Sequence, residues 1–109
     1  MAMIEERTDG TSLVALPRFA LPSGWTKTNT TVWFVVPVGY PASKPDCFWV
    51  EPDLLPSNGV TPANSGIQPI GGNGVPALWF SWHLSSWNPA HDDLMTYIRF
   101  IEARLRDVR

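Results

Sequence analysis

The chain has 109 residues, of which 44% are hydrophobic, and a formal net charge of −2. This length predicts one domain spanning residues 1–109, and the charge excludes the strongly basic surface of a nucleic-acid-binding protein. Cys47 is the only cysteine, so no intramolecular disulfide can form. No apolar run approaches the roughly 20 residues that cross a bilayer. These features predict a soluble, cytoplasmic protein with no membrane or nucleic-acid partner and no cofactor.

The first half of the chain predicts an antiparallel meander. Residues 1–10 are charged and are expected to form a frayed N-terminus. Strands are expected at residues 12–16, where Pro17 and Pro22 limit the run, at 31–36 and at 47–50. Because the connections between these runs are short, neighbouring strands should be antiparallel.

Residues 51–76 predict a long loop. They contain five prolines and five glycines, a composition that excludes a helix and makes a poor strand. Loops of this length in a small domain are usually functional or mobile. Residues 71–74 resemble a phosphate-binding loop only superficially, because no Lys-Ser/Thr pair follows. The aromatic segment 77–87 has no pattern that assigns its structure.

The last part of the chain predicts a helix. Asn88 is a favoured N-cap and Pro89 a favoured first helical residue, with Asp92 and Asp93 in the first turns. An apolar stripe follows at helical spacing, formed by Leu94, Ile98, Ile101 and Leu105. Arginines at the C-terminal end suit the helix dipole, or could contact an acidic partner. A helix packed on the meander gives an α+β layer.

Two sequence anchors resemble those of a known superfamily. Tyr40-Pro41 precedes Pro45 and a strand, and Trp87-Asn88-Pro89 precedes Leu94. In this order they resemble the ubiquitin-conjugating (UBC-like) superfamily, with its "YPxxPP" corner and its "WSPxxxL" helix opening. The segments at 21–24 and 81–84 look like prokaryotic family E of that superfamily.

The resemblance covers about residues 13–105 and carries expectations for fold and partners. It implies a UBC-like α+β fold, in which an antiparallel meander packs against a C-terminal helix and the long Pro/Gly-rich segment crosses between them. It also implies a role in a bacterial ubiquitin-like modification pathway. The implied partners are a ubiquitin-like protein, a ThiF-like activating enzyme and a JAMM-type peptidase.

The chain departs from the superfamily at the thioester cysteine. That cysteine normally lies eight residues before the second motif's tryptophan, where this chain has Trp79, and the preceding "HPN" tripeptide is absent. Cys47 falls where the superfamily keeps a core aliphatic residue, so it is expected to be buried with a raised pKa. The resemblance therefore implies a protein that acts by binding the ubiquitin-like protein or its activating enzyme, without thioester chemistry. Any catalysis would be of the transferase type.

His83 is the candidate catalytic residue. It could act as an acid or base, or orient a carboxyl terminus; the alternative is a histidine bonded to backbone that pins its segment. A Ser–His–Asp arrangement of Ser81, His83 and Asp92 lacks a nucleophile elbow. The spacing of Cys47, His83 and His91 matches no metal-binding pattern, so no metal is predicted.

Tyr40, Trp79 and Trp82 are candidate partner-binding residues. Irregular alternation of aromatic and polar residues is typical of a binding platform, although core packing beneath the long loop would give the same pattern. Trp87 is assigned a structural role beside the crossing segment. The two anchors are expected to frame one cleft that holds no exposed sulfur. The alternative function is a stand-alone aromatic-rich domain that binds a sugar or a peptide.

Overall fold

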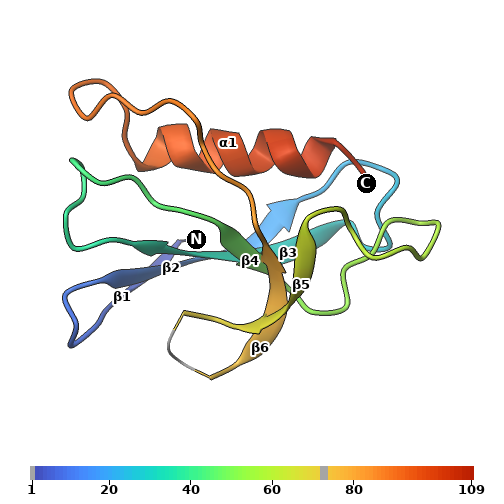
Figure 1. The fold of residues 1–109 in the computed structure, drawn as a ribbon. Helices are drawn as coiled ribbons and strands as arrows, with labels where there is room; N and C mark the ends of the chain where they lie inside the picture. The colour runs from blue at the N-terminus through green and yellow to red at the C-terminus, as the bar shows by residue number, and fades with distance from the viewer. Residues whose placement is uncertain (1, 72–73) are drawn as a thin grey trace.

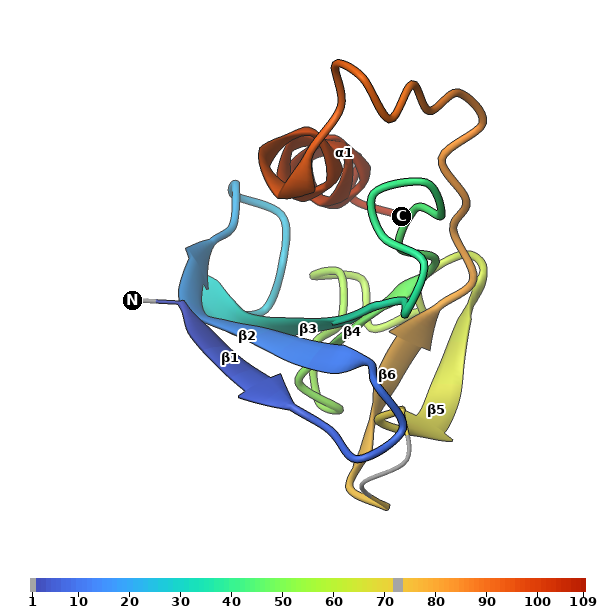
Figure 2. The same cartoon turned by 90° about the vertical axis from the view of Figure 1, so that its left-hand side faces the viewer.

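The computed structural model describes residues 2–71 and 74–109. Over these residues the chain forms one six-stranded antiparallel sheet in the order β1-β2-β3-β4-β6-β5 and one helix that lies across one face of the sheet (Figures 1 and 2). The elements are β1 Met3–Glu6, β2 Ser12–Ala20, β3 Asn29–Val36, β4 Phe48–Val50, β5 Ser65–Pro69, β6 Pro76–Phe80 and α1 Leu94–Arg106. The predicted α+β class is confirmed, and the arrangement is compatible with a UBC-like fold. Within the described residues, no helix is long and apolar enough to cross a membrane.

The N-terminal strands extend further than the sequence predicts. Residues 3–6, expected to fray, pair with β2 as an edge strand. Strand β2 also continues past Pro17, because the register shifts between Leu16 and Phe19 and Arg18 adopts a φ of 58°. Such a bulge accommodates a proline, whose missing N–H cannot join the ladder.

The proline-rich segment contains a strand. Residues 65–69, which the sequence assigns to a loop, form β5 and pair with β6 from Ser65 opposite Phe80 to Pro69 opposite Pro76. Because β5 lies at the edge of the sheet, its second side needs no ladder donors, and Pro69 is tolerated at its end. The Gly-rich stretch at 71–74 lies partly outside the described residues.

The helix begins six residues later than Asn88. Asp93 is the N-cap: its Oδ1 accepts from the Thr96 N–H at 3.1 Å, and the Thr96 hydroxyl accepts from the Asp93 N–H at 3.1 Å, forming a reciprocal capping box. Asn88 and Pro89 instead form a separate turn, in which the Asn88 carbonyl accepts from the Asp92 N–H at 2.7 Å. The expectation that Asn88 caps the helix is therefore wrong, because Asp93, five residues later, caps it instead.

Two apolar clusters lie on opposite faces of the sheet. The larger fills the space beneath α1, where Phe48 and Phe80 stack with their centroids 4.8 Å apart. The smaller, on the other face, contains Leu13, Trp49, Ile70 and Ala77 and no helix residue. Adjacent residues on one strand point to opposite faces. Phe80 of β6 therefore packs in the larger cluster, and its neighbour Trp79 packs against the smaller one.

Polar contacts join the C-terminal end of α1 to the segments that connect the strands. Trp25 Nε1 donates to the Leu105 carbonyl at 2.8 Å. Arg104 is buried: its guanidinium donates to the Ala63 carbonyl at 2.9 Å and lies 5.0 Å from the Trp82 ring centroid. Burial, reinforced by nearby Arg109, lowers the pKa of Arg104. This arginine is therefore a structural residue rather than part of an exposed basic tail.

Candidate functional site

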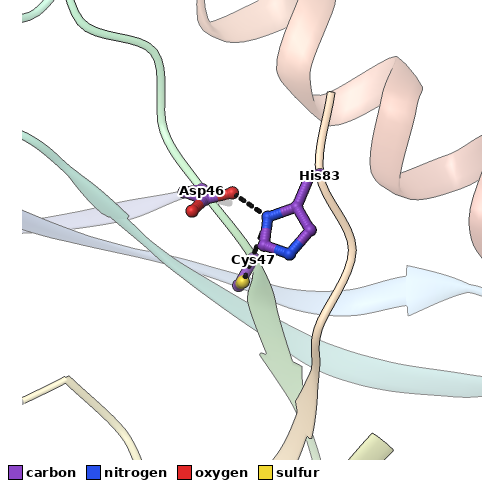
Figure 3. Close-up of side chains that lie close together, drawn as sticks. All are labelled: Asp46, Cys47 and His83. Carbon is purple, nitrogen blue, oxygen red and sulfur yellow. Dashed lines mark hydrogen bonds and ion pairs between the residues drawn. The ribbon is translucent and has the colours of Figure 1, made fainter. Parts of the chain in front are cut away.

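The candidate site lies where the segment before β4 passes the segment after β6. Phe48 and Phe80 are cross-strand partners, so the same antiparallel register carries residues 46–47 past residues 81–83. Figure 3 shows the side chains of Asp46, Cys47 and His83 meeting between these two segments. The potential metal-ligand atoms of these side chains, a carboxylate oxygen, a sulfur and a ring nitrogen, lie within 4.8 Å of one another. The sheet register therefore assembles the site from residues 36 or 37 positions apart in the chain.

His83 and Asp46 form the most direct contact. His83 Nδ1 lies 2.6 Å from Asp46 Oδ1, and the His83 Nε2 lies 3.4 Å from the Ser81 hydroxyl oxygen. The side chains of His83 and Asp46 are 59% and 55% exposed. The pair therefore presents an oriented imidazole to solvent, where a large partner can reach it.

Cys47 lies beneath this pair and is 7% exposed. Burial raises the pKa of its thiol, which keeps it protonated. Its sulfur is 3.9 Å from His83 Nδ1, and its carbonyl accepts from the buried Tyr97 hydroxyl at 2.6 Å. Cys47 also has a φ of 59°, uncommon for a residue with a side chain. The expected burial and raised pKa are confirmed, although the fold brings to it a histidine that is distant in sequence.

The two sequence anchors meet beside the site. Trp87 Nε1 donates to the Pro41 carbonyl at 2.8 Å, and the rings of Trp87 and Tyr40 have centroids 6.2 Å apart. The Tyr40-Pro41 peptide bond is cis. One anchored segment leads to Asp46 and the other comes from His83, so this contact braces both sides of the pair. Two hollows lie away from this contact, one at residues 56–63 with Arg109 and one along β1, β2 and β3.

The sequence profile of the prokaryotic E2 family E matches residues 2–108. The chain belongs to this family. No curated protein and no solved structure matches it. Membership establishes a ubiquitin-conjugating-like protein at the level of the family.

The candidate partner-binding residues of this family E chain do not form one surface. Tyr40 packs on Trp87, whereas Trp82 lies against the helix-side core and the Arg104 guanidinium. Trp79 lies on the opposite face of the sheet, in a row of paired residues with Trp49 and Trp33. Of the three candidates, Tyr40 alone belongs to the braced corner described above. A partner-binding role for Trp79 or Trp82 remains a prediction.

Asp46 is the site residue that the sequence did not indicate. The acid considered for His83 was Asp92, but the Asp92 carboxylate accepts from the Asn88 N–H at 2.7 Å instead. Asp46 follows the proline corner with no recognisable motif around it. Its only sequence signal is its position, two residues before β4, which pairs with the strand leading to His83.

The cluster of Asp46, Cys47 and His83 also contains three metal-ligand types. Tetrahedral zinc places an oxygen and a nitrogen ligand about 3.3 Å apart when each is about 2.0–2.1 Å from the metal. The 2.6 Å between Asp46 Oδ1 and His83 Nδ1 is shorter and is a hydrogen-bond distance. The observed geometry therefore corresponds to a carboxylate that holds an imidazole by its N–H.

Proposed function

We propose that this protein acts in a ubiquitin-like modification pathway, where it binds a ubiquitin-like protein or its ThiF-like activating enzyme at the surface around His83. The observation that supports this most directly is the exposed imidazole–carboxylate pair, set beside the superfamily's Tyr-Pro corner and the tryptophan of its second motif. An open surface suits a protein chain as substrate, because a small molecule generally needs a pocket to enclose it. Membership of a ubiquitin-conjugating-like family supports a pathway of this class.

The same geometry argues against a thioester on Cys47. A thiol becomes nucleophilic as the exposed thiolate, and here the sulfur is buried with a raised pKa. His83, by contrast, contacts side chains rather than backbone at both ring nitrogens. This favours a functional histidine over one that pins its segment to the backbone.

We propose that the incoming C-terminal tail of the ubiquitin-like protein approaches across Tyr40 towards His83. The ring of Tyr40 is partly exposed and braced by Trp87, so a tail could lie on it at little cost in side-chain entropy. A terminal carboxyl or carbonyl would then meet the imidazole. The JAMM-type peptidase remains a further proposed partner, and the cytoplasm the proposed compartment.

Calorimetric titration tests the binding. The titrants are the ubiquitin-like protein and the activating enzyme from the same genome, together with a form of the former that lacks its last four residues. Loss of one hydrogen bond to a charged group costs about 1.5–3 kcal/mol, so His83→Ala should weaken binding about 10–100-fold. His91→Ala removes an exposed histidine elsewhere and is the matched control.

Two outcomes would count against this function. If neither protein binds, the pathway assignment fails, and clear binding to glycans or peptides would favour the stand-alone ligand-binding domain. If truncation of the tail leaves the affinity unchanged, the partner binds at another face. No comparison favours the ligand-binding alternative.

A further inference from the structure

The two ring nitrogens of His83 have different side-chain partners. Nδ1 is 2.6 Å from Asp46 Oδ1, and Nε2 is 3.4 Å from the Ser81 hydroxyl oxygen. A carboxylate can only accept hydrogen bonds, so the Nδ1 atom carries the hydrogen. In that tautomer Nε2 presents its lone pair to the hydroxyl. Both contacts can therefore exist together, with Asp46 orienting the ring and Ser81 donating to it.

We propose that Ser81 is an acyl-accepting nucleophile, with His83 as its general base and Asp46 as the residue that positions His83. This inference rests on the proposed function and names the chemistry of that site. The substrate is the C-terminal acyl group of a ubiquitin-like protein, delivered as a thioester on the activating enzyme. The product is an oxyester on Ser81.

The transfer balances in atoms and charge. The Ser81 oxygen attacks the thioester carbonyl while its proton passes to His83 Nε2. Collapse of the tetrahedral intermediate breaks the carbon–sulfur bond, and the proton on His83 passes to the departing thiolate of the activating enzyme. A thioester and an alcohol thus give an oxyester and a thiol, with neutral His83 restored and no redox partner needed. Asp46 remains a carboxylate and stabilises the transient imidazolium.

The local structure holds these groups in place. The Ser81 N–H donates to the Asn64 carbonyl at 2.8 Å, and residue 81 directly follows the end of β6. On the other side, the Tyr97 hydroxyl fixes the carbonyl of Cys47, the neighbour of Asp46. The 3.4 Å contact between Ser81 and His83 is long for a hydrogen bond, as is common in catalytic pairs before substrate binds.

Cys47 is a poorer nucleophile in the same cluster. Its sulfur approaches His83 through Nδ1, the nitrogen already bonded to Asp46, so the basic nitrogen is not available to it. It is also buried, whereas Ser81 is partly exposed. Attack by the Ser81 hydroxyl can therefore use the lone pair of His83 Nε2 as the base. Attack by the Cys47 thiol would first require the bond between Asp46 and His83 to break.

The test is a transfer assay with the activating enzyme, ATP and the ubiquitin-like protein, in which thioester loading of the activating enzyme is checked first. The proposal expects a covalent adduct that survives reducing agent and is cleaved by hydroxylamine. Ser81→Ala should abolish the adduct, Ser81→Cys should make it sensitive to reducing agent, and Cys47→Ala should retain it. The matched control is Ser86→Ala, which removes an exposed hydroxyl five residues further along the same segment.

The supporting residues have separate readouts. At saturating concentrations of the loaded activating enzyme, where weaker binding no longer limits the rate, His83→Ala should slow transfer about 10²–10⁴-fold, the usual range for a general base. Asp46→Asn should lower the transfer rate at saturating concentrations of the loaded activating enzyme while leaving thermal stability unchanged. A purely structural role for Asp46 would instead reduce affinity and thermal stability together.

The outcomes distinguish this inference from the function on which it rests. Binding without any adduct from a loaded activating enzyme would overturn the serine chemistry and leave the binding function standing. An adduct that reducing agent cleaves and that is absent in Cys47→Ala would also overturn it, since the nucleophile would be the thiol. Absence of binding would remove both.

Discussion

The hydroxyl of Tyr97 is the polar group on which the position of Cys47, and with it Asp46, depends most directly. Tyr97 lies on α1, is fully buried between the helix and the sheet, and donates to the Cys47 carbonyl at 2.6 Å. Tyr97→Phe keeps the ring but leaves that carbonyl buried without its partner. Such a loss costs about 1–3 kcal/mol. For 109 residues the unfolding entropy at the midpoint is about 0.23 kcal/mol/K, so Tm should fall by about 4–13 °C.

The same residue predicts a distinct loss of stability at high pH. Burial raises the pKa of Tyr97 well above its ordinary value of 10.0. The unfolded chain therefore ionises first, and the contribution of the protonated hydroxyl is complete below pH 10 and lost as pH rises above it. The slope approaches about 1.4 kcal/mol per pH unit. Tyr97→Phe has no hydroxyl to ionise at this position. The difference in free energy of unfolding between the variant and the wild type should therefore shrink by about 1.4 kcal/mol at pH 11.

Urea unfolding followed by tryptophan fluorescence between pH 7 and pH 11 measures both effects. Tyr40→Phe is the matched control, because Tyr40 is partly exposed, and it should change stability by less than about 0.5 kcal/mol. The buried thiol of Cys47 also has a raised pKa, but it is present in both proteins and cancels in the comparison. A Tyr97→Phe protein as stable as wild type at pH 7, with the same alkaline slope, would refute the reasoning.

Three further measurements follow from the structure. Trp87→Phe keeps the ring contact with Tyr40 but loses the bond to the Pro41 carbonyl, and should cost about 0.5–1.5 kcal/mol in urea unfolding; no cost would mean that the anchors are not braced by this bond. Asp93→Ala should cost about 1 kcal/mol and reduce helicity in circular dichroism, whereas a larger effect of Asn88→Ala would place the helix start at Asn88 instead. The thiol of Cys47 should react with a thiol reagent at pH 8 only as fast as the protein unfolds; rapid reaction of the folded protein would show that the sulfur is accessible.

Local residue chemistry predicted three of the six described strands and the apolar face of the helix, but missed features that depend on pairing. The β-branched run of β3 is a strand on propensity alone. Strand β5 has no such signal, since Ser65, Gly66 and Pro69 are poor strand formers, and it exists because β6 offers it a complete ladder. The helix start was missed for a related reason. Asn88-Pro89 and Asp93 are both good caps, and tertiary position decides between them.

The site was predictable only in part. The sequence singled out His83 and the burial of Cys47, because each rests on the residue itself and its place in the anchored segments. The meeting of the anchors was also expected, and the bond from Trp87 to Pro41 confirms it. Asp46 could not be found, because its contact with His83 spans 37 residues and depends on which strand pairs with β4. The chain order β5-β6 and the spatial order β4-β6-β5 differ at that point.

The register between β4 and β6 determines whether His83 can function at all. Side chains alternate along an extended segment. Trp82 contacts Arg104 under the helix, whereas its neighbours Ser81 and His83 contact each other, and His83 also contacts Asp46. A slip of one residue would turn the imidazole into the core and expose the indole. The stacked rings of Phe48 and Phe80 and the tryptophan pair on the opposite face both oppose that slip. These paired aromatic residues therefore help to fix the strand register that keeps an exposed histidine beside its carboxylate.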